Sequence, residues 1–560
     1  MHNLDWFVLI FTLIIIVVYG TWKTRGAKTA NEYIKAGNEA KWWTIGLSVM
    51  ATQASAITFL STPGQAYNDG LGFVQFYFGL PIAIVLVCTI FIPVYHKLKV
   101  YTAYEFLESR FDLKTRSLTA LLFLIQRSLS ASITIFAPAI ILSTVLGWDL
   151  ITTNIIIGTL VIIYTVTGGT KAVNFTQKYQ MGIILIGLVI VLFTIFNLLP
   201  DDIDFNNAVK IASANSKMDV LNFSFDLDNR YTVWSGIIGG TFLMMSYFGT
   251  DQSQVQRYLS GKSLKEMQLG MIFNGIFKIP MQFFILFIGV MVFVFYQFNP
   301  SPLNFNPQGK IIISNTNYEN EYIQLEENLE NNFKEKTYIL NDVLSQDKMV
   351  VKGKIDKLNF EEKKIRDRAK LLIEKAAKEK NEKVETNDKD YVFINFILDN
   401  LPKGLIGLLL AVIISAAMSS TSSEINALAT TTSIDVLKRN FSYVDDNNIV
   451  YFTKLMTLFW GMCAIGIACV AYLADNLIQL VNIIGSIFYG NVLGIFLIAF
   501  FIKTLKSNAV FAGAIITQAV IIIAWFYDWM PFLWLNVFGC GLVIMISFLI
   551  HLFFKIFRVS

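Results

Sequence analysis

A serine-rich segment within residues 405–439 carries the clearest chemical pattern in the chain. Its small and hydroxyl residues follow i, i+3, i+4, i+7 spacing and share one face of a helix: Ala416, Ser419, Ser420 and Ser423. Hard cations prefer oxygen ligands, so the pattern predicts a cation site. The alternative is that these serines only bond to the preceding turn or join two helices.

Two cationic residues, Arg127 and Lys278, lie inside long apolar stretches. An intramembrane charge is costly and is expected to face a cavity or a partner. Arg127 could bind a carboxylate through two hydrogen bonds. The alternative for Arg127 is a structural ion pair with an acid such as Asp251.

Cysteines and histidines suggest no metal centre or disulfide. The four cysteines lie in apolar runs without metal-site spacing, and the three histidines are far apart: Cys88, Cys463, Cys469 and Cys540, with His2, His96 and His551. Apart from the coupling ion, we expect no metal, cofactor or enzymatic activity.

The composition places these residues in a membrane protein. Of 560 residues, 54% are apolar and 15% charged. Thirteen apolar runs can each cross a ~30 Å hydrocarbon core as a helix: they lie near 4–21, 42–63, 71–95, 117–147, 150–167, 178–199, 230–255, 266–299, 391–433, 449–473, 476–502, 508–527 and 531–556. We therefore predict an all-α fold.

The loop charges predict the orientation of these spans. Odd-numbered connections are rich in Lys and Arg, beginning with Lys23, Arg25 and Lys28, whereas short even-numbered ones are nearly free of them. Because cytoplasmic loops carry the positive excess, we expect the N-terminus outside and the C-terminus, with Lys555 and Arg558, in the cytoplasm. The expected location is the inner (plasma) membrane, with the first run retained as a span.

Residues 300–390 differ from the rest. Lys and Glu alternate there at helical spacing, which favours a solvated helical hairpin or a partly disordered insert outside the cytoplasm. A regulatory role is the alternative.

The remaining spans form two groups of five, each opening with a helix interrupted by small and polar residues. Such matching helices are typical of inverted-repeat transporters with a site at the midplane. The predicted organisation has seven parts: 1–41, an extra span and loop; 42–199, the first repeat; 200–229, an outer loop; 230–299, core helices 6 and 7; 300–390, the insert; 391–502, core helices 8 to 10; and 503–560, two extra helices.

The chain resembles the sodium:solute symporter family, whose members share the LeuT-like five-plus-five fold. The resemblance covers nearly everything outside 300–390 and rests on four landmarks: WWTIGLSVMATQASAITFLSTPGQAYNDG, GGTKAVNFTQKYQ, TDQSQVQRYLSGKSLKEMQ and the serine-rich segment. The segment SAITFLSTPGQAY resembles the branch that carries monocarboxylates, iodide and vitamins.

The resemblance implies sodium ligands. The common site corresponds to backbone carbonyls and hydroxyls at Ala51, Ala54, Ala416, Ser419 and Ser420. A second site, present in some members, would use Ser422, Ser423 and an acid whose position here holds Gln177. Because a neutral amide lacks the charge that offsets a cation, we expect one sodium ion per cycle.

The resemblance also implies substrate and gate positions. The substrate positions that it implies are Ile57, Thr58, Phe76, Tyr77, Tyr247, Phe248, Lys278 and Asn482, and the gate residues are Tyr247 and Arg257. Arg127 joins the substrate-binding set because of its charge within an apolar span. The apolar replacements among these positions disfavour a neutral hexose.

Together these features predict a sodium-coupled symporter that imports a small organic anion, such as a monocarboxylate or acidic sugar, by alternating access. The alternatives are a sodium-independent facilitator, a proton-coupled carrier, and a solute sensor that uses the insert. We expect the solute, sodium and lipid as partners, with no nucleic acid and no obligate protein.

Overall fold

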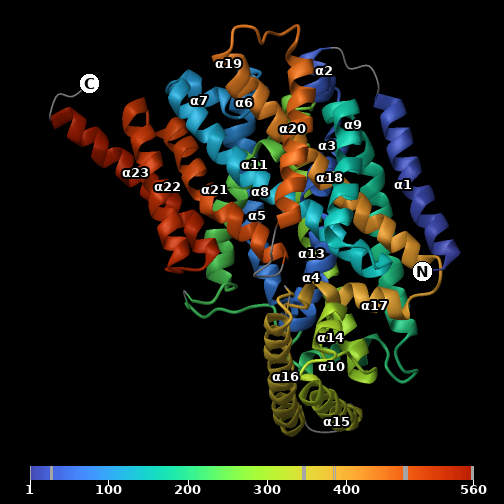
Figure 1. Ribbon diagram of the computed structural model, residues 1–560. Helices are drawn as coiled ribbons and strands as arrows, with labels where there is room; N and C mark the ends of the chain where they lie inside the picture. Colours follow the sequence, from blue (N-terminus) through green and yellow to red (C-terminus); the bar gives the residue numbers. More distant parts are fainter. Residues whose placement is uncertain are drawn as a thin grey trace.

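The computed structural model describes residues 2–24, 29–226, 228–343, 348–382, 384, 386–470 and 477–556 (Figure 1). Within these ranges the protein is helical and contains no strand beyond one isolated bridge between Ala40 and Gly261. The prediction of an all-α fold is confirmed. Arg25, Lys28 and Arg558, which the topology prediction used, lie outside the described residues.

Long helices build the bundle, with α1 along one edge and α21, α22 and α23 at the opposite edge (Figure 1). The helices of the bundle are α1 (Asn3–Thr24), α3 (Trp42–Gln53), α4 (Ala56–Asp69), α5 (Leu80–Leu86), α6 (Ile92–Leu98), α8 (Leu113–Leu146), α9 (Leu150–Asn197), α11 (Gly240–Gly249), α12 (Gln252–Tyr258), α13 (Leu264–Phe298), α17 (Val392–Asn400), α18 (Leu405–Thr431), α20 (Ile449–Val470), α21 (Leu477–Phe501), α22 (Ser507–Phe526) and α23 (Phe532–Ile556). Shorter elements at the helix connections are α2 (Ala30–Lys35), α7 (Glu105–Arg110), α10 (Phe205–Ala214) and α19 (Lys438–Asn440).

The helices are long and apolar enough for a membrane. Nine helical segments of the described residues meet the length and hydropathy of a span, and shorter apolar helices cover Asn3–Ile14 and Leu150–Ile163. Large apolar side chains such as Phe7, Ile186 and Phe193 point outward, as lipid contact requires. The protein is therefore a multi-pass membrane protein, and the count of thirteen spans stays a prediction.

Several predicted spans have different ends in the structure. The runs 150–167 and 178–199 are joined in α9, which kinks at Gly169, where φ is 53°. Only glycine adopts that conformation readily, and a Cβ there would lie 2.7 Å from the Tyr33 carbonyl oxygen. The run 391–433 is instead divided at Leu401–Gly404 into α17 and α18, because Pro402 disfavours a continuous helix.

The first group opens with an interrupted helix, as predicted. Helix α3 ends at Gln53, Ala54 has non-helical dihedrals (φ −84°, ψ 71°) and Ser55 is extended before α4 begins. The last carbonyls of α3 therefore have no intrahelical donor. This leaves backbone oxygens free for another ligand within the bundle.

The second group opens with a matching break. Helix α11 ends at Gly249, and α12 begins after Asp251, whose carboxylate accepts a hydrogen bond from the Ser253 amide (2.9 Å). The two interrupted helices confirm the pattern expected of an inverted-repeat transporter.

The charged insert forms a helical hairpin of α15 (Glu319–Val343) and α16 (Lys348–Glu379), preceded by α14 (Pro307–Ile313). The hairpin projects from the end of the bundle where the N-terminus lies, and α23 ends on the opposite side (Figure 1). Glu362 of α16 pairs with Lys336 (3.2 Å) and Arg366 (3.0 Å). Arg366 also donates to the Leu303 carbonyl (3.1 Å), so this network connects the hairpin to the segment that follows α13.

Candidate functional site

Oxygen atoms of α3 and α18 meet at the first helix break. The Ser419 hydroxyl donates to the Ala51 carbonyl oxygen at 3.4 Å, and both residues are buried. Ala54 directly follows the last residue of α3, at the interruption. The predicted serine face therefore points toward the interrupted helix rather than toward lipid.

Ser420 lies next to this contact. Its hydroxyl donates to the Ala416 carbonyl (3.1 Å) or the Ala417 carbonyl (3.2 Å), so its lone pairs stay available to another ligand. Ser420 also lines the central cavity. Of the predicted sodium ligands, Ser419 and Ala51 are thus in contact between α18 and α3, and Ser420 bonds to Ala416 within α18.

The residues of the second predicted sodium site are arranged differently. The Gln177 amide nitrogen lies within hydrogen-bond distance of Thr52 Oγ1 (3.0 Å), the Ser419 carbonyl (3.3 Å) and Ser423 Oγ (2.9 Å). Its amide oxygen accepts from Ser48. Ser422 donates only to the Ser419 carbonyl (3.0 Å) among the described contacts, so it is not brought to Gln177.

A cavity of about 90 Å³ lies beside these residues. Seven predicted substrate positions line it: Ile57, Thr58, Phe76, Tyr77, Arg127, Tyr247 and Asn482. The other lining residues are Thr52, Gln53, Ser55, Thr134, Leu243, Met244, Ser420, Glu424, Ile478, Val481 and Tyr489. Phe248 does not line the cavity but packs behind Tyr247, with ring centroids 5.1 Å apart.

Lys278 of α13 also lies behind the cavity wall. It is 1% exposed, and its ammonium is 5.9 Å from the centroid of the Tyr77 ring. Among the described residues, no acid lies within ion-pair distance of it. Lys278 is thus a buried lysine with no acidic partner among the described residues, next to the ring of Tyr77 that lines the cavity.

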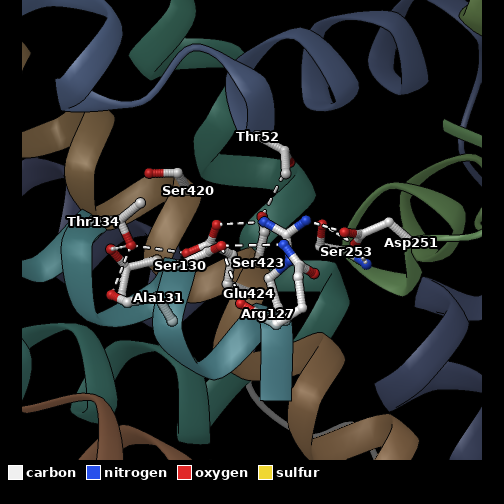
Figure 2. Close-up of polar contacts among 12 residues, drawn as sticks. Thr52, Arg127, Ser130, Ala131, Thr134, Asp251, Ser253, Ser420, Ser423 and Glu424 are labelled. Carbon is white, nitrogen blue, oxygen red and sulfur yellow. Dashed lines mark hydrogen bonds and ion pairs between the residues drawn. The ribbon is translucent and has the colours of Figure 1, made fainter. Parts of the chain in front are cut away.

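Arg127 is held by two acids (Figure 2). Its guanidinium pairs with Asp251 and with Glu424, whose Oε1 lies 2.9 Å from Nη1. The Tyr489 hydroxyl lies 2.6 Å from Nη2 and 2.9 Å from Asp251 Oδ2. The structural pair with Asp251 that the sequence offered as an alternative is present, and Glu424 adds a second pair.

Glu424, Thr134 and Tyr489 are site residues that sequence reasoning missed. Thr134 donates to Glu424 Oε2 at 2.8 Å. Glu424 was detectable, because an acid inside an apolar span is as unusual as a cation. Nothing in the local sequence distinguishes Thr134 or Tyr489 from ordinary helix residues.

The two predicted gate residues lie on α11 and α12. The Tyr247 hydroxyl accepts from Gln254 (2.6 Å), and its ring is 5.6 Å from the Arg127 guanidinium. Arg257 is fully buried and donates to Asn174 Oδ1 (3.1 Å). Both side chains lie in the packed region of the interrupted helix, but only Tyr247 reaches the cavity.

Comparison with known proteins agrees with this architecture. The model of the sodium:solute symporter family matches residues 33–336 and 376–517. The human sodium/iodide cotransporter is 25% identical over 515 residues, covering 91% of this chain and 67% of that protein. Human sodium-coupled monocarboxylate transporter 1 is 26% identical over 498 residues, covering 89% of this chain and 68% of that protein.

The fold has a close counterpart among solved structures. The outward-open structure of a Na⁺-coupled sialic acid symporter superimposes with a TM-score of 0.75 at 23% identity, covering 99% of this chain and 98% of the other. At that identity the likeness shows the fold alone. The family match extends over both interrupted helices and the serine-rich helix, so this chain, a transporter and not an enzyme, belongs to the sodium:solute symporter family.

Proposed function

We propose that this protein imports a small organic anion together with one sodium ion by alternating access. The observation that carries the proposal is the contact between Ser419 Oγ and the Ala51 carbonyl across the helix break. Hydroxyl and carbonyl oxygens are the ligands that a hard cation prefers. The proposed ligands are Ala51, Ala54, Ala416, Ser419 and Ser420.

The position of the proposed sodium site supports coupling. Ser420 lines the cavity that also contains the proposed substrate positions. A cation held between α3 and α18 would fix the interrupted helix and thereby shape the cavity wall next to it. Sodium would then enter down its concentration gradient; since one sodium ion and one monovalent anion together carry no net charge, the membrane potential adds no driving force to their joint transport.

Charge and size favour a small anion as substrate. The cavity holds only about 90 Å³, and Lys278 places a buried amine behind Tyr77, which a bound anion would favour in its protonated form. The names of similar proteins refer to iodide and monocarboxylates, both of which are small anions. Sodium and a monovalent anion also add no net charge to the membrane interior, which limits the cost of desolvation.

The proposed location is the inner (plasma) membrane. In the proposed orientation, the N-terminus and the insert lie outside the cytoplasm and the C-terminus lies in it. The positive loop charges favour this direction. The N-terminus and the α15–α16 hairpin lie at one end of the bundle and α23 ends at the other, which supports termini on opposite sides (Figure 1).

The test is radiolabelled uptake into proteoliposomes, with and without an inward sodium gradient. The screen compares monocarboxylates, acidic sugars, neutral sugars and amino acids. We expect sodium-driven accumulation of a carboxylate. Equal uptake in sodium and choline would support a facilitator, and accumulation of neutral sugars alone would refute the anion assignment.

A further inference from the structure

Arg127 lies between two carboxylates that come from different parts of the fold (Figure 2). Arg127 belongs to α8, Asp251 precedes α12, and Glu424 belongs to α18. All three side chains are buried, with exposed fractions of 2%, 1% and 5% for Arg127, Asp251 and Glu424. The group has one positive and two negative charges, so one negative charge lacks a partner within it.

The two acids are not held equally. Asp251 accepts from the Ser253 amide (2.9 Å), the Ser253 hydroxyl (2.7 Å) and the Tyr489 hydroxyl (2.9 Å), in addition to Arg127. Glu424 has only Arg127 and the Thr134 hydroxyl (2.8 Å) among the described partners. Glu424 also lines the cavity, whereas Asp251 does not. Glu424 is therefore the acid that can leave Arg127.

Arg127 has a donor to spare. Its Nε is buried and makes no hydrogen bond to the described residues, while Nη1 is bonded to Glu424. Guanidinium groups bind carboxylates well because they present several donors in one plane. Displacement of Glu424 would thus free Nη1 on an arginine that lines the cavity.

A cation is expected close to Glu424. Ser420 precedes it by four residues on α18, so the two side chains share a helix face, and both line the cavity. Ser420 is a proposed sodium ligand. The unpaired negative charge of the Arg127 group therefore faces the position where the coupled cation would bind.

We propose that Glu424 is an exchangeable counterion that couples sodium to substrate, an inference that rests on the proposed function. Without sodium, Glu424 neutralises Arg127 and blocks it. Sodium attracts the Glu424 carboxylate, and the carboxylate of the substrate takes its place on Arg127. The exchange adds one cation and one anion, so the net charge of the group is unchanged. Asp251 stays on Arg127 throughout and keeps it positioned.

The experiment measures uptake of radiolabelled lactate over a range of sodium concentrations in wild type, Glu424→Gln, Glu424→Asp and Asp251→Asn. In wild type we expect the KM for lactate to fall as sodium rises. In Glu424→Gln the competing charge is gone, so we expect a KM at low sodium at least about tenfold below wild type, with little further change as sodium rises. The sodium concentration for half-maximal uptake should increase.

The companion variants separate coupling from structure. Glu424→Asp should restore the sodium dependence of KM at least in part, and Asp251→Asn should lower the maximal rate without relaxing that dependence. If Glu424→Gln does not fold, Thr134→Val takes its place, because it removes the other partner of Glu424 and should also lower KM at low sodium. The inference is overturned if the KM of the folded variant depends on sodium concentration in the same way as the KM of wild type.

The two proposals fail in different ways. Absence of sodium-dependent lactate uptake in wild type refutes the proposed function for this substrate and the inference with it. Sodium-dependent uptake in wild type with an unchanged KM pattern in Glu424→Gln refutes the inference alone.

Discussion

The amide nitrogen of Gln177 lies 2.9 Å from Ser423 Oγ and connects α9 to the serine-rich helix α18. The same nitrogen approaches Thr52 Oγ1 and the Ser419 carbonyl oxygen, so three oxygens from two helices surround it. The two hydroxyls donate elsewhere, Thr52 to the Ser48 carbonyl and Ser423 to the Ser419 carbonyl. Their lone pairs can therefore face the amide, in the way that they would face a cation.

Replacing Gln177 by Asp should open this place to a second sodium ion. The substitution removes the amide hydrogens and supplies a negative charge beside three oxygens, which is the chemistry that a hard cation needs. We expect the Hill coefficient of sodium-dependent uptake to rise from about one toward about two. Gln177→Asn is the control, since it is neutral and of the same size as Asp. A wild-type Hill coefficient near two would contradict the single-sodium assignment.

Much of this site follows from local sequence pattern. The i, i+3, i+4, i+7 spacing of the serines predicts one helix face, and the contact between Ser419 and Ala51 places that face toward the interrupted helix. The two breaks are also evident from small and polar residues in apolar spans. The serine spacing and the helix breaks depend on residues close together in the chain, whereas the contact between Ser419 and Ala51 joins residues 368 positions apart.

Long-range pairing does not follow from local spacing: the sequence offered Asp251 only as an alternative partner of Arg127, and it did not indicate Glu424. Arg127 is 124 residues from Asp251 and 297 residues from Glu424, and helical spacing carries no information about such pairs. The ends of α9 and α17 were also missed. Hydropathy detects apolar length, but a kink at Gly169 and a helix end near Pro402 depend on backbone conformation.

Removing the Ser419 hydroxyl should weaken sodium binding. Ser419→Ala deletes the side-chain oxygen that faces Ala51, and a ligand of this kind is worth about 1.5–3 kcal/mol, or about tenfold to a hundredfold in affinity. Sodium-dependent thermal stabilisation of the purified protein in detergent measures the effect directly. Ser422→Ala is the matched control, because the Ser422 hydroxyl bonds to the Ser419 carbonyl of its own helix. Equal losses in both variants would contradict the proposed ligand set.

Lys278 should determine the preference for anions. Lys278→Met keeps an unbranched side chain of similar size but removes the buried charge behind Tyr77. We expect the KM for a carboxylate to rise at least about tenfold, since a buried charge interaction is worth more than about 1.4 kcal/mol. Sodium-dependent thermal stabilisation should persist. Lys178→Met, at a partly exposed position of α9 beside Phe175, provides the control for loss of a lysine. Unchanged carboxylate KM in Lys278→Met would argue for a purely structural lysine.

The insert should detach from the bundle in acid. Burial alone would raise the pKa of Glu362, but the charges of Lys336 and Arg366 outweigh it and lower the pKa from 4.5 to about 2. A carboxylate with a lowered pKa stabilises the folded state above its unfolded pKa, and this contribution is lost as the pH falls from about 4.5 to about 2. The full effect is on the order of 3 kcal/mol.

Amide hydrogen exchange at a series of pH values, corrected for the intrinsic exchange rate, tests this expectation in the whole protein. Protection of α16 should fall as the pH is lowered from about 4.5 toward about 2, while protection of the apolar helix α20 stays constant. At neutral pH, α16 of Glu362→Gln should be less protected than α16 of wild type, because Lys336 and Arg366 lose the acid that they share. The protection of α16 in this variant should change little with pH. The contrary result would be a wild-type α16 that keeps its protection at pH 3, which is below the unfolded pKa of about 4.5. Apolar contacts of buried residues such as Leu372 and Ile373 would then hold the hairpin instead of the ion pairs.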